Sequence, residues 1–196
     1  MKFYPIQQHT PIRRKIIDKK GNYSSYKGEL REDFSSKCGY CDSPDYYSGG
    51  RKGFHIDHFA PKSKFVNLKN DYDNLIYCCP VCNIGKGDDW PSNNPKVSYS
   101  NNIGYIDPCD PLYQKNLIRN ADGTIVPLTP LGQYIHKKLK LSLKRRQICW
   151  LMEQMEKQMK DLTSIMLQQD SNPADVEALC RLVQEYFRYV GILKRE

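Results

Sequence analysis

The sequence predicts an α+β fold, in which a small cysteine-rich core of two strands and one helix precedes a C-terminal helical segment. Two observations support this prediction. Two C-x-x-C pairs enclose short runs in which apolar and polar residues alternate, as they do in strands. Eleven of the 12 prolines precede residue 131, so the last third of the chain has few helix breakers.

Composition and charge restrict the class of protein. The chain has 196 residues, of which 39% are hydrophobic, so it can form a packed core. Its net charge of +8 favours a polyanionic partner. Most of this charge lies in two flanks: a basic N-terminal segment, residues 1–37, carries +5, and residues 131–196 carry +4. A polyanion held from both sides of the neutral centre would fit this pattern.

The apolar stretches of the sequence indicate in which compartment we expect the protein. No stretch approaches the roughly 20 consecutive apolar residues that a membrane span needs, and the N-terminal residues do not resemble a signal peptide. We therefore expect a cytoplasmic protein without membrane partners. In a reducing compartment its eight cysteines are not expected to form disulfides.

Four of these cysteines have the spacing of a zinc site. Cys38 and Cys41 form one C-x-x-C pair, and Cys79 and Cys82 form another. Two such turns supply the four thiolates of a closed tetrahedral site, which leaves no position open for catalysis and makes the zinc structural. Cys78 adjoins Cys79 and could replace it, although the x-x spacing favours Cys79. The 37 residues between the pairs leave room for a functional insert.

The insert and the residues after it predict a strand, a loop, a second strand and a helix. Residues 54–59 and 75–78 have strand character, and a short helix follows Cys82, weakened by the nearby glycines. We therefore predict a zinc-stapled core over residues 38–90.

A loop-rich connection, residues 91–130, leads to the C-terminal α-helical region, residues 131–196. Thr129-Pro130 predicts the start of a first helix, a second is expected from near Ser142, and Asn172-Pro173 predicts a third. The methionine-rich stripe of the second helix fits either core packing or a face for a partner.

The core also contains the residue types that phosphodiester hydrolysis needs. Asp57 and Asn83 offer oxygen ligands for a hard cation, Mg²⁺ or Mn²⁺. His58, next to Asp57, is the candidate general base. Asn74 can hold the loop that carries this base, and Lys86 lies one helical turn after Asn83, where a cation could contact phosphate.

Three further residues have open roles. Lys62 and Lys64 can contact a nucleic-acid backbone or can be ordinary surface lysines. In an ideal strand His55 shares a face with Asp57 whereas His58 points to the other face. A bulge or a strand end near residues 57–58 is then needed to bring Asp57 and His58 together, and His55 is either a third ligand or a support for the strand.

At these positions the sequence resembles the HNH endonuclease family. The matching residues are Asp57-His58, Asn74-Leu75, Cys79-x-x-Cys82-Asn83 and Lys86. The resemblance implies a ββα-metal, treble-clef-like fold, His58 as general base, Asp57 and Asn83 as ligands of the catalytic ion, Asn74 as the residue that orients the loop, and a structural zinc. Asparagine at the last position, where the family also has histidine, favours Mg²⁺.

Shorter motifs resemble the HNH subunits of bacterial anti-phage systems of the Septu and retron-associated types. This similarity implies a partner ATPase, bound through the C-terminal helices. The motifs are Leu30-Arg31-Glu32-Asp33-Phe34, Ile106-Asp107-Pro108-Cys109-Asp110-Pro111, Asp122-Gly123 and Leu131-Gly132.

The sequence therefore predicts a metal-dependent DNA endonuclease, with a role in anti-phage defence. A homo-oligomer is possible, because cutting both strands with one site in each chain favours a dimer. The alternative is a non-catalytic, zinc-stapled subunit that binds nucleic acid or docks a partner.

Overall fold

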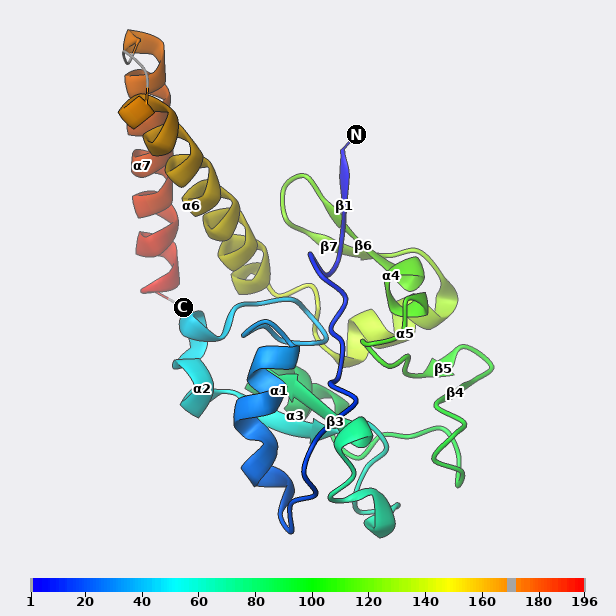
Figure 1. Cartoon of the computed structure of the whole chain (residues 1–196). Helices are drawn as coiled ribbons and strands as arrows, with labels where there is room; N and C mark the ends of the chain where they lie inside the picture. The colour runs from blue at the N-terminus through cyan, green and yellow to red at the C-terminus, as the bar shows by residue number, and fades with distance from the viewer. Residues whose placement is uncertain (1, 169–171, 196) are drawn as a thin grey trace. The chain divides into compact units, whose positions relative to one another are not determined.

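The computed structural model describes residues 2–168 and 172–195 and divides the chain into two compact units, residues 1–142 and 143–196 (Figure 1). Helices and short strands are mixed in the first unit, and the described residues of the second unit form two helices. The predicted α+β class is confirmed. Within the described residues, every helix is too short or too polar to cross a membrane.

The centre of the first unit is a two-stranded antiparallel sheet with one helix. Strand β2 (His55–His58) pairs with β3 (Leu75–Cys78) without a bulge, from His55 opposite Cys78 to His58 opposite Leu75. Helix α3 (Pro80–Lys86) follows directly. Pro80 is at the first position of this helix, where its missing N–H is not needed, and the Cys79 sulfur accepts from the Cys82 amide at 3.5 Å. The predicted order of strand, loop, strand and helix is confirmed.

Short helical elements precede and connect these strands. They are η1 (Tyr23–Tyr26), α1 (Lys27–Asp33), η2 (Asp45–Ser48), α2 (Gly50–Gly53), η3 (Val66–Leu68) and η4 (Tyr72–Asn74). Helix α1 packs against β3, and Leu30 of α1 and Phe34, which follows the helix, are both buried in the core. On the other side of the core the rings of Phe54 and Tyr77 pack with their centroids 4.9 Å apart. This apolar packing holds the ends of β2 and β3 in place.

The remaining elements of the first unit form two further sheets and two helices. A three-stranded antiparallel sheet has the order β1, β6, β7, and a two-stranded sheet pairs β4 with β5. These elements are β1 (Phe3–Pro5), β4 (Tyr99–Ser100), β5 (Ile103–Gly104), α4 (Leu112–Asn116), β6 (Leu117–Asn120), β7 (Ile125–Pro127) and α5 (Pro130–Lys138).

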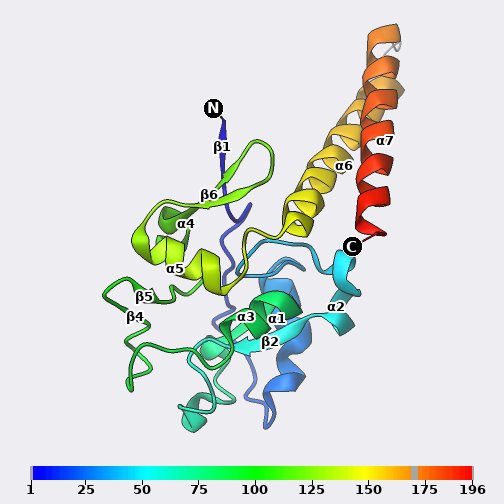
Figure 2. The same ribbon diagram turned by 180° about the vertical axis from the view of Figure 1, so that it is seen from behind.

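The end of α5 packs closely against α3, as seen from behind in Figure 2. A Cβ at Gly85 would lie 2.4 Å from the Lys138 carbonyl oxygen, so only glycine permits this approach. The Lys138 amino group also pairs with Asp89 at 2.9 Å. Gly85 therefore allows α5 to pack against α3. From the sequence alone we expect only that this glycine weakens the short helix.

The second unit is a helical hairpin of α6 (Lys144–Gln168) and α7 (Pro173–Leu193). The Asn172 side chain caps α7 by accepting from the Asp175 amide at 3.0 Å, and Thr129 caps α5 in the same way through Gly132. All three predicted C-terminal helices are confirmed, the second starting two residues after Ser142.

Candidate active site

The four cysteines of the two C-x-x-C pairs converge at one buried point. Their sulfur atoms all lie within 4.8 Å of one another, and those of Cys41 and Cys79 are 3.9 Å apart. Tetrahedral zinc with Zn–S bonds of about 2.3 Å separates its sulfurs by roughly 3.8 Å, so the cluster fits this ion. Burial raises the pKa of the Cys38 thiol well above its usual range, and a cation is therefore needed to hold four thiolates here.

Cys79, and not Cys78, belongs to the cluster. The Cys78 sulfur is buried on β3 and lies 3.9 Å from the His55 carbonyl oxygen instead. Successive residues of a strand point to opposite faces, and therefore these neighbours cannot both face the metal site.

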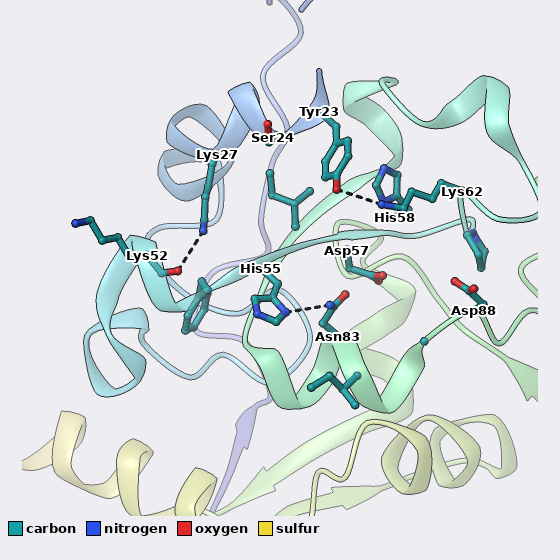
Figure 3. Close-up of a pocket in the computed structure, with 15 residues that line it drawn as sticks. Tyr23, Ser24, Lys27, Lys52, His55, Asp57, His58, Lys62, Asn83 and Asp88 are labelled. Atoms are coloured by element: carbon teal, nitrogen blue, oxygen red, sulfur yellow. Dashed lines mark hydrogen bonds between the residues drawn. The ribbon is translucent and has the colours of Figure 1, made fainter. Parts of the chain in front are cut away.

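A second site opens beside the sheet as a pocket of about 550 Å³ (Figure 3). Elements β2, α3, η1, the start of α1 and the end of α2 contribute to its wall. Its polar lining residues are Tyr23, Ser24, Lys27, Lys52, His55, Asp57, His58, Lys62, Asn83 and Asp88.

Asp57 lies on β2 and is buried, with only 5% of its surface exposed. Its Oδ2 accepts from the Tyr40 hydroxyl at 2.6 Å and lies 3.2 Å from the Lys86 amino nitrogen. Burial raises the pKa of Asp57, and the charge of Lys86 and the bond from Tyr40 oppose this effect. The two partners favour the carboxylate form, which is the form that binds a cation.

Asn83, on α3, presents its amide to the same space. Its Nδ2 lies 3.0 Å from His55 Nδ1, within hydrogen-bonding distance. The amide oxygen consequently lies on the side of the Asp57 carboxylate (Figure 3). A carboxylate and an amide oxygen that face one space are a donor set for a hard divalent cation, so these residues fit such an ion. His55 holds Asn83 in this orientation.

His58 is the last residue of β2, and its ring is fixed from two sides. Its Nε2 lies 2.9 Å from the Lys69 carbonyl oxygen. A carbonyl oxygen only accepts, so Nε2 carries the proton and Nδ1 of the neutral ring keeps its lone pair. The Tyr23 ring packs edge-on against the imidazole, with centroids 4.6 Å apart. Burial, with nearby positive charge, lowers the pKa of His58 and keeps the ring neutral near pH 7.

The four-cysteine cluster and most of the residues that line the pocket lie on one segment of the chain, and this segment matches a known protein family. Residues 38–89 match the family model of the HNH endonuclease. Comparisons with curated proteins and with solved structures found no match. The matched residues include both C-x-x-C pairs, β2, β3 and α3, and we call them the HNH domain.

Within the HNH domain, Asn74 ties the loop after β2 to the start of β3. Its Oδ1 accepts from the Ala60 amide at 2.8 Å, and its Nδ2 donates to the Ala60 carbonyl at 3.0 Å and to the Leu68 carbonyl at 3.3 Å. The segment that Asn74 holds begins directly after His58. The side chain is buried and does not line the pocket.

The lysines of the HNH domain differ in their positions. Lys62 lines the pocket and donates to the Tyr23 hydroxyl at 3.1 Å. Lys64 instead donates to the Trp90 carbonyl at 3.1 Å. Lys86 departs from the expected phosphate contact, because its amino group is buried between Asp57 and the His58 carbonyl, 2.9 Å away. Its place on the inner face of α3 turns it away from any substrate.

Several residues of the site have no recognisable signal in the sequence. Tyr23 and Lys27 precede the HNH domain, and no spacing connects them to its motifs. Tyr40, which contacts Asp57 but does not line the pocket, lies inside the first C-x-x-C turn, where the cysteine spacing says nothing about the residue between the ligands. An exposed lysine such as Lys52 has no local pattern that distinguishes it from other surface lysines.

Proposed function

We propose that this protein is a metal-dependent endonuclease that hydrolyses DNA phosphodiester bonds with His58 as its general base. The observation that carries the proposal is the joint position of His58, Asp57 and Asn83 on one pocket. A neutral imidazole with a fixed ring and two oxygen donors on one pocket are the groups that water activation next to a bound phosphate requires. A binding module has no need of this combination.

His58 takes the proton in this proposal. With Nε2 bonded to the Lys69 carbonyl, Nδ1 can accept a proton from a water molecule that attacks the scissile phosphorus. The imidazolium that forms keeps its bond to this carbonyl. Tyr23 and the Asn74-tied loop keep the ring in position, so the base does not lose orientational freedom at the moment of reaction.

Asp57 and Asn83 would hold a divalent ion, Mg²⁺ or Mn²⁺. When bound, such an ion neutralises the charge that develops on the phosphate oxygens and on the departing 3′ oxygen. Lys86 and Tyr40 keep the Asp57 carboxylate ionised and pointed to this space, and His55 does the same for the Asn83 amide. The resemblance to HNH endonucleases implies products with a 5′-phosphate and a 3′-hydroxyl.

The four-cysteine cluster would hold a zinc ion with a structural role. Its thiolates are the full ligand set of a tetrahedral ion, and they connect the turn before β2 to the start of α3. In this way the zinc sets the separation of Asp57 and Asn83 without contacting substrate.

The wider role that we propose is anti-phage defence, as a nuclease that works with a partner ATPase. The short motifs outside the HNH domain support this role. The second unit also carries exposed apolar residues, among them Ile165, Val176 and Phe187, which a partner could cover.

Incubation with defined substrates tests the proposed function. Supercoiled plasmid, single-stranded DNA and RNA are incubated with the purified protein, with Mg²⁺, with Mn²⁺ and with no added divalent ion. We expect DNA cleavage that requires the added ion and is lost in His58→Ala. Cleavage of RNA alone would contradict the substrate class. If wild type and His58→Ala leave every substrate equally intact, with and without candidate partners, the non-catalytic subunit is the better account.

A further inference from the structure

We infer that Lys27, Arg51 and Lys52 form a second phosphate subsite, which binds the DNA backbone beside the bond that is cut. This inference rests on the proposed function, and it adds residues that the HNH motifs do not include. We call these three residues the Lys27 cluster. Two of them, Lys27 and Lys52, line the pocket.

The Lys27 cluster gathers positive charge from two elements. Lys27 begins α1, and its amino group donates to the Lys52 carbonyl of α2 at 3.4 Å. The Arg51 guanidinium reaches α1 as well, since a Cβ at Gly28 would lie 3.8 Å from its Nη1. Among the described residues none of the three forms an ion pair with an acidic side chain.

An arrangement of like charges without acidic partners favours a bound anion. Burial and the charge of Arg51 both lower the pKa of Lys27, which shows that the neighbouring cations repel one another. At some other sites of the first unit a carboxylate neutralises the basic side chain, for example Asp45 beside Arg31 and Asp33 beside Arg14. A phosphate bound at the Lys27 cluster would offset the repulsion among its positive charges, as the carboxylates do at those other sites.

The position of the cluster indicates which phosphate it binds. Figure 3 shows Lys27 and Lys52 on the His55 side of Asp57, with Lys62 on the other side. A nucleic-acid strand carries one negative charge for roughly every 3.4 Å along the helix axis. A strand with its scissile phosphate at Asp57 therefore has further phosphates on both sides, one of them toward the cluster and one toward Lys62.

The cluster is also rigidly connected to the catalytic centre. Helix α2 ends two residues before β2 begins, and α1 packs against both α2 and β3. A phosphate held at the cluster consequently fixes the register of the strand relative to Asp57 and His58, which a mobile surface lysine could not do.

The test measures binding separately from cleavage. The cluster is changed by Lys27→Gln, Arg51→Gln and Lys52→Gln together, in a His58→Ala background. The control carries Lys19→Gln, Lys96→Gln and Lys115→Gln, which remove the same charge from exposed positions outside the pocket. Affinity for a fluorescently labelled DNA duplex is measured by anisotropy over a range of salt concentrations.

We expect the cluster variant to bind DNA roughly tenfold more weakly or worse, and its slope of log affinity against log salt to be smaller by about 1 or more. The control should change little in either quantity. If the cluster variant and the control show the same affinity and the same slope, the subsite does not exist.

A minimal diester separates this inference from the proposed function. Bis(p-nitrophenyl) phosphate has only one phosphate, so it has no second phosphate for the cluster when the first is at Asp57. The cluster variant with His58 intact should therefore hydrolyse it like wild type while its KM for DNA rises. Loss of hydrolysis of this compound would show that the cluster supports the catalytic centre itself, and would overturn the inference. If wild type cleaves neither substrate, the proposed function fails, and the anisotropy experiment still decides the subsite.

Discussion

The amino nitrogen of Lys86 lies 3.2 Å from Oδ2 of Asp57, and both side chains are almost completely buried. The same nitrogen donates to the His58 carbonyl at 2.9 Å, so one lysine contacts two neighbouring residues of β2. In this way α3 is held to β2 at the point where the proposed metal ligand and the proposed base lie side by side.

Removal of only one partner of this ion pair should strongly destabilise the protein. Lys86→Met leaves the Asp57 carboxylate buried without a positive charge beside it, and we expect a loss of about 3 kcal/mol in the free energy of unfolding. Adding Asp57→Asn should recover part of this loss, because the second change removes the uncompensated charge. Urea denaturation of the wild type, both single variants and the double variant measures the coupling; additive effects would contradict it.

The pH dependence of DNA cleavage should report His58. Burial and the charges of Lys62 and Lys86 lower the pKa of the imidazole below its ordinary value of about 6.5. Protonation removes the base, so kcat/KM should fall with decreasing pH only below this value. Lys62→Gln removes one of these charges and should move the acid limb to higher pH.

Lys64→Gln is the matched control for the shift of the acid limb that we expect in Lys62→Gln. It removes the same charge from a lysine that is bonded to the Trp90 carbonyl, and the limb should stay close to that of wild type. Equal shifts in the two variants would show that net charge, and not the position of Lys62, sets the pKa.

The zinc cluster can be tested with a pair of neighbouring cysteines. Cys79→Ser removes a cluster ligand, and we expect the purified variant to contain much less zinc than wild type and to unfold at a lower temperature. Cys78→Ser changes the adjacent buried thiol outside the cluster and should keep the zinc content of wild type. Metal analysis by mass spectrometry gives the ratio of zinc to protein in each variant. Zinc loss in Cys78→Ser with full retention in Cys79→Ser would reverse the assignment.

Tyr23 should act as a positioning residue for His58. Its ring packs on the imidazole and its hydroxyl accepts from Lys62. Tyr23→Ala should lower kcat roughly tenfold by freeing the ring, with a smaller effect on KM. Tyr23→Phe keeps the ring and should retain most of kcat. If both variants lose kcat equally, the hydroxyl and not the ring is the important part.

Local patterns in the sequence predicted the four-cysteine cluster and the starts of two helices. The C-x-x-C spacing marked the four cysteines that converge, and the prolines after Thr129 and Asn172 marked the helix starts that the structure shows. Such features depend on residues only a few positions apart, so they can be read without knowledge of the fold.

The parts that remained unpredicted depend on contacts between distant segments. The alternation of a strand placed His55 with Asp57 but could not show that β2 ends at His58, which is what allows that ring to turn into the same pocket. Lys86 has the spacing of a surface cation on a helix, yet tertiary packing buries its amino group against Asp57. Tyr23 reaches His58 across 35 positions of sequence, and no periodicity extends that far.

The most direct test of the central claim compares DNA cleavage by His58→Ala and by wild type after both have been shown to contain the same amount of zinc. Equal zinc content establishes that the cysteine cluster is formed in both proteins, so any difference belongs to the imidazole. With Mg²⁺ present, the account predicts ion-dependent cleavage of plasmid DNA by wild type and a loss of at least roughly a hundredfold in the variant. Cleavage at the same rate by the zinc-loaded His58→Ala protein would contradict it.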